Sequence, residues 1–345
     1  MDVLSVLNTI NIVIIAIGIA CNGSVLLIII SGKVNSSPRN YLLANIALGD
    51  LFLLVTSGLL SVLIDYEVLN NFDKIVCLST NASIVISQGV AVLTLMSLSM
   101  DRFLAIVHPF AILRLRPGKI YGTVIVLIWI ISLVVATPIF FLGNADKAIN
   151  NSYCHYVPEY TRPGRIYDCV RAALFYVLPL SVIGVSYVLM AHRIFRSTAF
   201  AKRSSNSSRR VQKERQKLGI LVLAIVVLFA VCWAPATFYS IYKHYKFVNV
   251  ELYFFLESIH LKEWRSTLIF INACTNPIIL YLMSKSYREG FVKLVSWKTR
   301  SSSRFTSIQT SLSSIRSRHF IRIKEGHELS QLGEKTTPND TDGDA

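Results

Sequence analysis

Charged residues are scarce in this chain: Asp, Glu, Lys and Arg make up 16% of its 345 residues, while 53% are hydrophobic. A soluble globular domain is nearer a quarter charged. The apolar residues also fall into long blocks with almost no charge inside them. The composition therefore excludes an ordinary soluble domain and indicates a membrane protein.

The first apolar block lacks the basic leader of a secretory signal peptide. It begins almost at Met1, carries Asp2 and continues to about Ser31, which is longer than the apolar core of a signal peptide. We therefore expect this block to be retained as the first membrane span.

Seven blocks are long enough to cross a hydrocarbon layer of roughly 30 Å as helices. Asp50 is the one charged residue inside them. Their continuous apolar character excludes a β-barrel, in which apolar and polar residues alternate, and leaves an all-α, seven-transmembrane helix bundle. The predicted spans are residues 4–31, 40–64, 78–100, 121–142, 172–191, 218–242 and 266–284.

Charge separates the segments between the spans into two sets. The N-terminus and residues 65–77, 143–171 and 243–265 contain 9 Lys and Arg against 10 Asp and Glu, whereas the other set contains 26 against 9. Basic loops stay in the cytoplasm, so we expect the N-terminus outside and the C-terminus inside. The net charge of +15 then reports topology and does not indicate a nucleic-acid partner.

The predicted domain comprises residues 1–296, and residues 297–345 form a polar cytoplasmic tail without fixed structure. At the end of the domain, Tyr287, Phe291 and Leu294 recur at helical spacing among basic residues. This pattern predicts an amphipathic eighth helix lying on the membrane lipids.

Two of the six cysteines, Cys77 and Cys154, fall in outer segments, where disulfides persist. A bridge between them would hold the segment between spans four and five over the mouth of the bundle; two free thiols are the alternative. Asn150 begins the one glycosylation sequon in an outer loop, so a glycan is predicted there.

Asp50 is an ionisable group in the middle of a span, which is costly and usually serves function. Amides on the first and seventh spans, Asn22, Asn272 and Asn276, are candidates to meet it. Such a cluster can hold a water network or a cation; an aspartate with a purely structural role is the alternative.

Asp101 and Arg102 end the third span at its inner face. The arginine can pair with the neighbouring carboxylate or release it and extend into a cleft, which would make the pair a switch that a ligand can bias. An arginine that merely reaches the membrane edge is the alternative.

Prolines interrupt the last three spans at Pro179, Pro235 and Pro277, and a proline kinks a helix and creates a pivot. Trp233 and Phe229 precede Pro235, so they can pass ligand contact to this pivot. Ordinary core packing is the alternative for each aromatic residue.

Taken together, these residues resemble the rhodopsin-like (class A) family of G-protein-coupled receptors, over about residues 5–295. Each span carries a mark of that family, in the right order. The marks are Asn22; LANIALGD ending at Asp50; Cys77 and, 25 positions later, Arg102 within MDRF; Trp129; Pro179 with Tyr187; FAVCWAP at 229–235; and NACTNPIILY at 272–281.

The resemblance implies a receptor, not an enzyme, that activates a heterotrimeric G protein. Its Ser- and Thr-rich tail would be phosphorylated by a receptor kinase and bind an arrestin. The implied sets are a G-protein switch of Asp101, Arg102, Tyr187, Asn276 and Pro277; a core polar network of Asn22, Asp50, Asn272 and Asn276; and a toggle of Phe229, Trp233 and Pro235.

Within the family, the chain is similar to the bombesin/gastrin-releasing-peptide, endothelin and CCHamide receptors. Leu280 stands where most of the family has Tyr and is followed by Tyr281, as in that group. This similarity implies an extracellular neuropeptide ligand and, more loosely, a Gq-type G protein. A receptor for a lipid or odorant, a scavenger that never couples, and a transporter or channel are the alternatives.

Several positions depart from the family pattern. Phe103 replaces the usual Tyr after the switch arginine, and Arg215 stands where the sixth span often carries an acid. We therefore expect Asp101 alone to restrain Arg102, with measurable basal activity. Ala91 and Ala273 replace two serines, which weakens the case for a sodium ion near Asp50; no other cofactor is expected.

Two absences narrow the ligand class. Ile84 stands where amine receptors carry an Asp, and no Lys that could bind retinal occurs between Lys262 and Lys285. The outer ends of the spans instead offer cationic and aromatic groups, which suit a peptide and equally an anionic lipid. The ligand-binding candidates are Ile84, Gln88, Tyr239, Tyr242, Lys243, Trp264 and Arg265.

Overall fold

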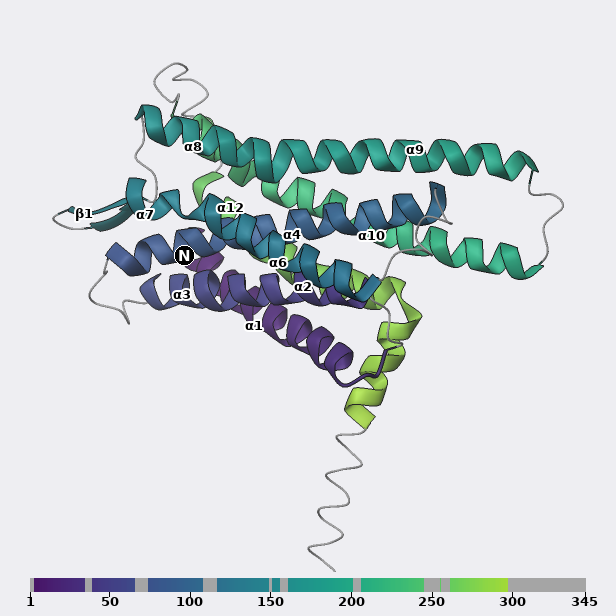
Figure 1. Ribbon diagram of the computed structural model, residues 1–345. Helices are drawn as coiled ribbons and strands as arrows, with labels where there is room; N and C mark the ends of the chain where they lie inside the picture. Colours follow the sequence, from purple (N-terminus) through teal and green to yellow (C-terminus); the bar gives the residue numbers. More distant parts are fainter. Residues whose placement is uncertain are drawn as a thin grey trace, which may run out of the picture. The chain divides into compact units, whose positions relative to one another are not determined.

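The computed structural model describes residues 3–34, 39–65, 74–107, 117–148, 151–155, 161–200, 206–244, 255 and 261–296. Residues Met1–Phe291 form one compact unit, and of the second unit, Val292–Ala345, only residues 292–296 are described. Within the described residues, seven helical segments are long and apolar enough to cross a membrane. The predicted seven-helix bundle is therefore confirmed (Figure 1).

Several spans are built from more than one helical piece. Residues 285–296 are also helical, as expected for an eighth helix. In chain order, the spans are α1 (Val3–Ile30); α2 (Arg39–Leu53), η1 (Leu54–Gly58) and α3 (Leu59–Asp65); α4 (Lys74–Val107); α6 (Pro117–Ala136) and α7 (Pro138–Leu142); α8 (Arg162–Ala172), η2 (Ala173–Val177) and α9 (Leu178–Phe200); α10 (Asn206–Tyr242); and α12 (Leu261–Met283).

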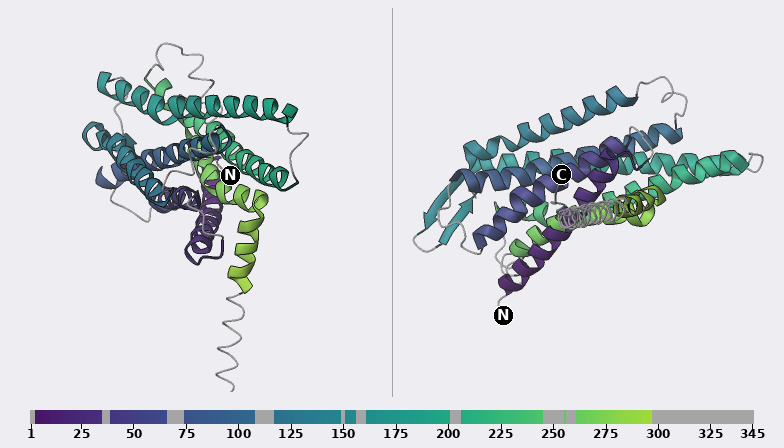
Figure 2. Two further views of the ribbon diagram at one scale, coloured as in Figure 1. Left: turned by 45° about the vertical axis from the view of Figure 1, so that its right-hand side comes forward. Right: turned by 90° about the horizontal axis from the view of Figure 1, so that it is seen from below.

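Helix α4 lies at the centre of the bundle, where it packs against α2, α6, α9 and α10 (Figures 1 and 2). Strands β1 (Asn144–Ala148) and β2 (Asn151–His155) form an antiparallel hairpin that also contacts α4 and that the sequence did not predict. We call the end of the bundle with this hairpin the hairpin end. The opposite end, where α4 carries Asp101 and Arg102, is the switch end.

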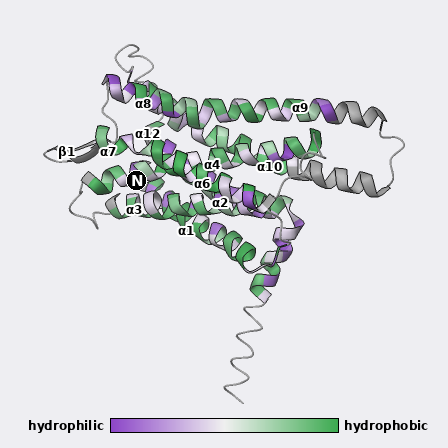
Figure 3. Cartoon of the chain, viewed as in Figure 1, coloured by the Kyte–Doolittle hydropathy of each residue, from purple (hydrophilic) through white to green (hydrophobic). Residues whose placement is uncertain are grey.

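The outward faces of the helices are apolar. Val134, Val188, Val231 and Leu282 each expose more than half of their surface, and Figure 3 shows apolar residues along most of the helices. Exposed apolar area on this scale is costly in water. It is explained by a lipid environment, in which these side chains face hydrocarbon.

Polar side chains join the spans on the inside. The indole Nε1 of Trp129 on α6 donates to Asn45 Oδ1 on α2 over 2.9 Å, and Asn45 Nδ2 donates to Thr94 Oγ1 on α4 over 2.8 Å. Hydrogen bonds between helices are a main source of association inside lipid. Asn45 therefore fixes three spans against one another.

The fifth span begins ten residues earlier than predicted. Thr161 caps α8 by accepting a hydrogen bond from the Gly164 backbone N–H over 3.2 Å, and a proline lies in the first turn, which favours a helix start. The longer helix brings Asp168 and Arg171 into the span. The expectation that Asp50 is the only charged residue within the spans is therefore wrong.

Candidate functional site

At the switch end, Arg102 and Asp101 form an ion pair. Arg102 Nη2 lies 2.9 Å from Asp101 Oδ2, and the two side chains expose only 4% and 8% of their surfaces. An arginine that merely reached the membrane edge would place its guanidinium in the polar interface. The burial thus favours a packed pair over an edge residue.

A third residue, Tyr121, contacts the Asp101–Arg102 pair. The Tyr121 hydroxyl on α6 donates a hydrogen bond to Asp101 Oδ1, so the two carboxylate oxygens bond to different partners, Tyr121 and Arg102. The expectation that Asp101 acts alone omitted this residue. Tyr121 belongs to no sequence motif, and only the packing of α6 on α4 brings it here.

Tyr187 links two further helices at the switch end. Its hydroxyl on α9 donates to the backbone carbonyl of Gly219 on α10 over 2.9 Å. The bond ties the fifth span to the sixth beside the switch. The side chain of Arg215, one turn from Gly219, lies outside the described residues.

The predicted core polar network is formed in part. Asn276 Nδ2 donates to Asp50 Oδ2 over 2.9 Å, which joins the second and seventh spans. Asn22 Nδ2 donates to the backbone carbonyls of Gly18 and Ala273, both over 2.9 Å. The structure therefore brings Asn276 to Asp50, while Asn22 holds the backbone of α12. Asn272 is buried, and its Oδ1 has no partner among the described residues.

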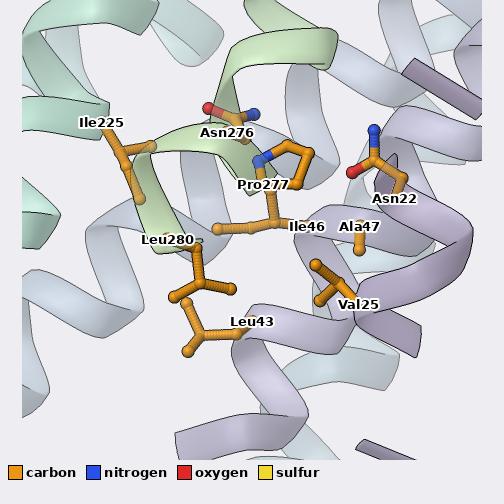
Figure 4. A pocket seen from close by; sticks show the side chains of 9 residues that line it. All are labelled: Asn22, Val25, Leu43, Ile46, Ala47, Ile225, Asn276, Pro277 and Leu280. Atoms are coloured by element: carbon orange, nitrogen blue, oxygen red, sulfur yellow. The ribbon is translucent and has the colours of Figure 1, made fainter. Parts of the chain in front are cut away.

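A small cavity of about 20 Å³ adjoins this network (Figure 4). Its volume is enough for about one water molecule. The Oδ1 atoms of Asn22 and Asn276 face no partner within the described part of the chain, so they are suited to bind such a water. The lining residues are Asn22, Val25, Leu43, Ile46, Ala47, Ile225, Asn276, Pro277 and Leu280.

Tyr281 follows the cavity-lining residue Leu280 but points toward the first span. Leu280 lines the cavity, whereas the Tyr281 hydroxyl lies 2.7 Å from Ser24 Oγ on α1. The unusual order Leu280-Tyr281 therefore places an apolar group beside Pro277 and anchors the seventh span to the first.

On the helix that follows the seventh span, burial raises the pKa of the Tyr287 hydroxyl, because the phenolate is disfavoured away from water.

The toggle residues are packed together in the last third of α10. The rings of Phe229 and Trp233 stack with their centroids 5.7 Å apart, and each exposes only 1% of its surface. Pro235 follows two residues later inside the helix. Trp233 Nε1 is buried without a hydrogen-bond partner among the described residues.

Most ligand-binding candidates lie near the hairpin end with graded exposure. The Arg265 guanidinium lies over the Tyr239 ring at 4.6 Å, a cation–π contact. Trp264 is 41% exposed and Ile84 is half-buried. Tyr242 is buried and stacks on Phe238 at 5.8 Å.

The other two candidates, Gln88 and Lys243, meet in a buried cluster that sequence reasoning missed. Lys243 Nζ and His244 Nε2 lie 3.0 and 2.9 Å from Asp168 Oδ2. Arg171 bonds to Asp168 Oδ1 over 3.4 Å and donates to Gln88 Oε1 over 2.9 Å. We call these five residues the Asp168 cluster. Lys243 is thus engaged inside the bundle, where it was expected at the outer mouth.

Cys77 is disulfide-bonded. Its predicted partner, Cys154, lies on β2, but the side chain is outside the described ones. Asn150 also lies outside the described residues. The pairing and the glycan therefore stay predictions.

Comparison with known proteins identifies the class. The seven-transmembrane receptor model of the rhodopsin family matches residues 21–280. The chain therefore belongs to the rhodopsin family of seven-transmembrane receptors, which are multi-pass plasma-membrane proteins and not enzymes.

Individual receptors of this family are similar to the chain over most of its length. The chain is 29% identical to the [Phe13]-bombesin receptor of Bombina orientalis over 86% of this chain and 77% of the relative. It is 30% identical to bombesin receptor subtype-3 of Ovis aries, over 81% and 72%. It is 29% identical to the allatostatin-A receptor of Bombyx mori, over 81% and 76%. The predicted similarity to bombesin receptors is confirmed.

Proposed function

We propose that this protein is a plasma-membrane receptor for an extracellular peptide and that it activates a heterotrimeric G protein. The observation that carries the proposal is the buried Arg102–Asp101 pair with Tyr121 on the carboxylate. A buried ion pair at one end of a helix bundle is strongly held, yet it can be replaced by another arrangement if the bundle shifts. The printed names of the relatives, bombesin and allatostatin-A receptors, support a peptide as the ligand.

In this proposal, the hairpin end faces outward and the switch end faces the cytoplasm. The distribution of Lys and Arg along the sequence supports this orientation. The aromatic and cationic groups Trp264, Arg265 and Tyr239 are then placed at the outer mouth, where they suit a peptide's aromatic and acidic groups.

The proposed activation mechanism rests on the contacts between α10 and its neighbouring helices. A ligand that presses on the Trp233 region would move α10 at Pro235 and α12 at Pro277. Movement of α10 would break the bond between Tyr187 and Gly219 and open the switch end. Arg102 could then leave Asp101 and contact the G protein. The ligand drives this change only through its higher affinity for the open arrangement.

We further propose Gq-type coupling, by similarity to the bombesin group. The Ser- and Thr-rich tail is the proposed substrate of a receptor kinase and the proposed binding site of an arrestin, because phosphate groups add charge that a cationic partner recognises.

The test is ligand-dependent GTP exchange in membranes of cells that express the receptor. Bombesin-like, CCHamide-like and allatostatin-A-like peptides are compared with long-chain lipids. Activation by a peptide supports the proposal, and activation by lipids alone overturns its peptide part. The absence of any exchange that depends on Arg102, with or without ligand, would overturn the assignment as a G-protein activator.

A further inference from the structure

We propose that the Asp168 cluster is the deep end of the ligand site and that it binds a carboxylate or carbonyl group of the ligand, because its buried side chains present an open amide donor beside two cations. This inference rests on the proposed receptor function. It deepens that function by naming the chemical group that enters deepest.

The side chains of the Asp168 cluster are held in fixed positions by the local fold. Capping by Thr161 starts α8 early enough to place Asp168 and Arg171 inside the bundle. Asp168 has no exposed surface, and Arg171 and Lys243 each expose 5%. Buried charges are tolerated only when they are paired and hydrogen-bonded. The cluster therefore joins α4, α8 and the end of α10 through contacts that hold its side chains in place.

Asp168 is the internal counter-charge of the cluster. Its Oδ1 bonds to Arg171, and its Oδ2 faces both Lys243 and His244. A ligand ammonium would have to displace these groups to reach the carboxylate. The arrangement therefore disfavours a cationic group of the ligand.

The hydrogen-bond donor that is left for a ligand is the side-chain amide of Gln88. Its Oε1 accepts from Arg171, which orients the amide and leaves Nε2 as a donor. Gln88 exposes only 1% of its surface, and Nε2 has no partner among the described residues. A buried donor without a partner destabilises the protein, and such donors are rare unless another group binds them. An acceptor group from a ligand would satisfy this donor.

Further open polar atoms extend from the cluster toward the toggle. The Thr237 hydroxyl on α10, the Thr267 hydroxyl on α12 and the Trp233 indole N–H are all buried without partners among the described residues. With a rise of about 1.5 Å per residue, Thr237 lies roughly 9 Å from Lys243 and 6 Å from Trp233 along α10. The open Thr237 hydroxyl therefore lies along α10 between the Lys243 end of the cluster and Trp233, so a ligand group bound at the cluster meets a further polar group on the way to the toggle.

The ligand group is identified by what these atoms require. The Gln88 amide and the Trp233 indole both donate, so their partner must accept hydrogen bonds. The guanidinium of Arg171 and the ammonium of Lys243 favour an anionic acceptor by charge. A carboxylate or carbonyl meets both conditions, whether it comes from the end of a peptide or from a fatty acid.

The test replaces Gln88 by Glu, which keeps the shape but turns the donor into an acceptor and adds negative charge. The matched control is Asn81→Asp, the same chemical change two turns earlier on α4, where the amide already donates to the Cys77 carbonyl over 3.0 Å. Gln88→Met is a second variant that removes the amide without adding charge. The amount of each receptor at the cell surface is measured with an epitope tag.

The probes are bombesin-like and allatostatin-A-like peptides, each with a C-terminal carboxylate, carboxamide or alcohol, together with long-chain fatty acids. We expect Gln88→Glu to raise the half-maximal concentration of an acid or amide agonist about 10- to 100-fold, since bonds to charged groups contribute about 1.5–3 kcal/mol. Gln88→Met should act in the same direction, and Asn81→Asp should change it by less than about twofold, since its amide is not an open donor.

Each outcome decides the question. Equal potency on Gln88→Glu and the unaltered receptor, or equal potency of the alcohol and acid peptides, overturns the proposal. Activation by fatty acids that Gln88→Glu weakens supports the carboxylate site while overturning the peptide part of the proposed function. If no probe activates a receptor that still shows Arg102-dependent basal exchange, the acceptor assignment is overturned and the receptor function stands.

Discussion

The bond between Tyr121 and Asp101 makes a specific prediction about signalling without ligand. Tyr121→Phe removes one hydroxyl and retains the ring that packs between α6 and α4. In the resting arrangement, the lost bond is made to a charged acceptor, and such bonds contribute about 1.5–3 kcal/mol. If the bond is absent in the active arrangement, its loss shifts the balance toward activity by at least about tenfold, because 1.4 kcal/mol is a factor of ten.

The expected signal is large enough to measure. Minor states of two-state proteins are populated at about 0.1–10%, so a receptor that is active for roughly 1% of the time would be active for about 10% of the time or more in the variant. The assay is GTP exchange in membranes without ligand, normalised to surface receptor. Tyr41→Phe is the control, because this tyrosine also lies toward the switch end, on α2, and is 56% exposed.

A second comparison separates a role through Asp101 from general loosening of the bundle. If Tyr121 acts by holding the carboxylate, Tyr121→Phe should add nothing to the basal exchange of the Asp101→Ala variant. Additive effects in the double variant, or unchanged basal exchange in the single variant, would refute the reasoning that Tyr121 restrains the switch.

Three further substitutions, the last with a matched control, test other contacts in the bundle. Arg102→Ala should abolish stimulated GTP exchange while surface expression is largely kept; full coupling would contradict the switch assignment. Asp168→Asn removes the carboxylate that faces Lys243, a change that costs about 3–5 kcal/mol in buried pairs, so the purified receptor should melt at a lower temperature, and an unchanged melting temperature counts against a structural role. Gly89→Ala would place a methyl group 2.7 Å from the Phe175 ring and should destabilise by about 1–3 kcal/mol, whereas Gly122→Ala meets nothing within 4 Å and should be neutral or stabilising in the same melting assay.

The number and order of the spans were predictable from the sequence because lipid imposes one dominant constraint. Every span must be long and apolar, and the backbone must be paired within it. The blocks of α1, of α6 with α7, and of α12 follow this rule, and their predicted limits differ from the observed ones by at most five residues. Local motifs likewise pointed to the Arg102–Asp101 pair, since the two residues are adjacent in the chain.

Contacts between distant side chains were harder to predict. Asp50 was expected to meet any of three amides, and the structure selects Asn276. The choice depends on the rotation of α12 about its axis, which a pattern of apolar residues fixes only loosely. Tyr121 was missed for the same reason, because its role follows from the packing of one helix face on another.

The fifth span shows where hydropathy misleads. Hydropathy predicts that the span begins at residue 172, just after the charges of Asp168 and Arg171, although a span can contain charges that pair inside the bundle. A different signal was available: Thr161, followed by Pro163, is a helix-start pattern, and it places the beginning of α8 correctly. This helix start makes Asp168 a second intramembrane carboxylate, and the argument that marks Asp50 as a functional candidate then applies to Asp168 as well. Its partners on α10 would still have required the structure, because Lys243 stood among several cations that the sequence could assign equally well to the outer mouth.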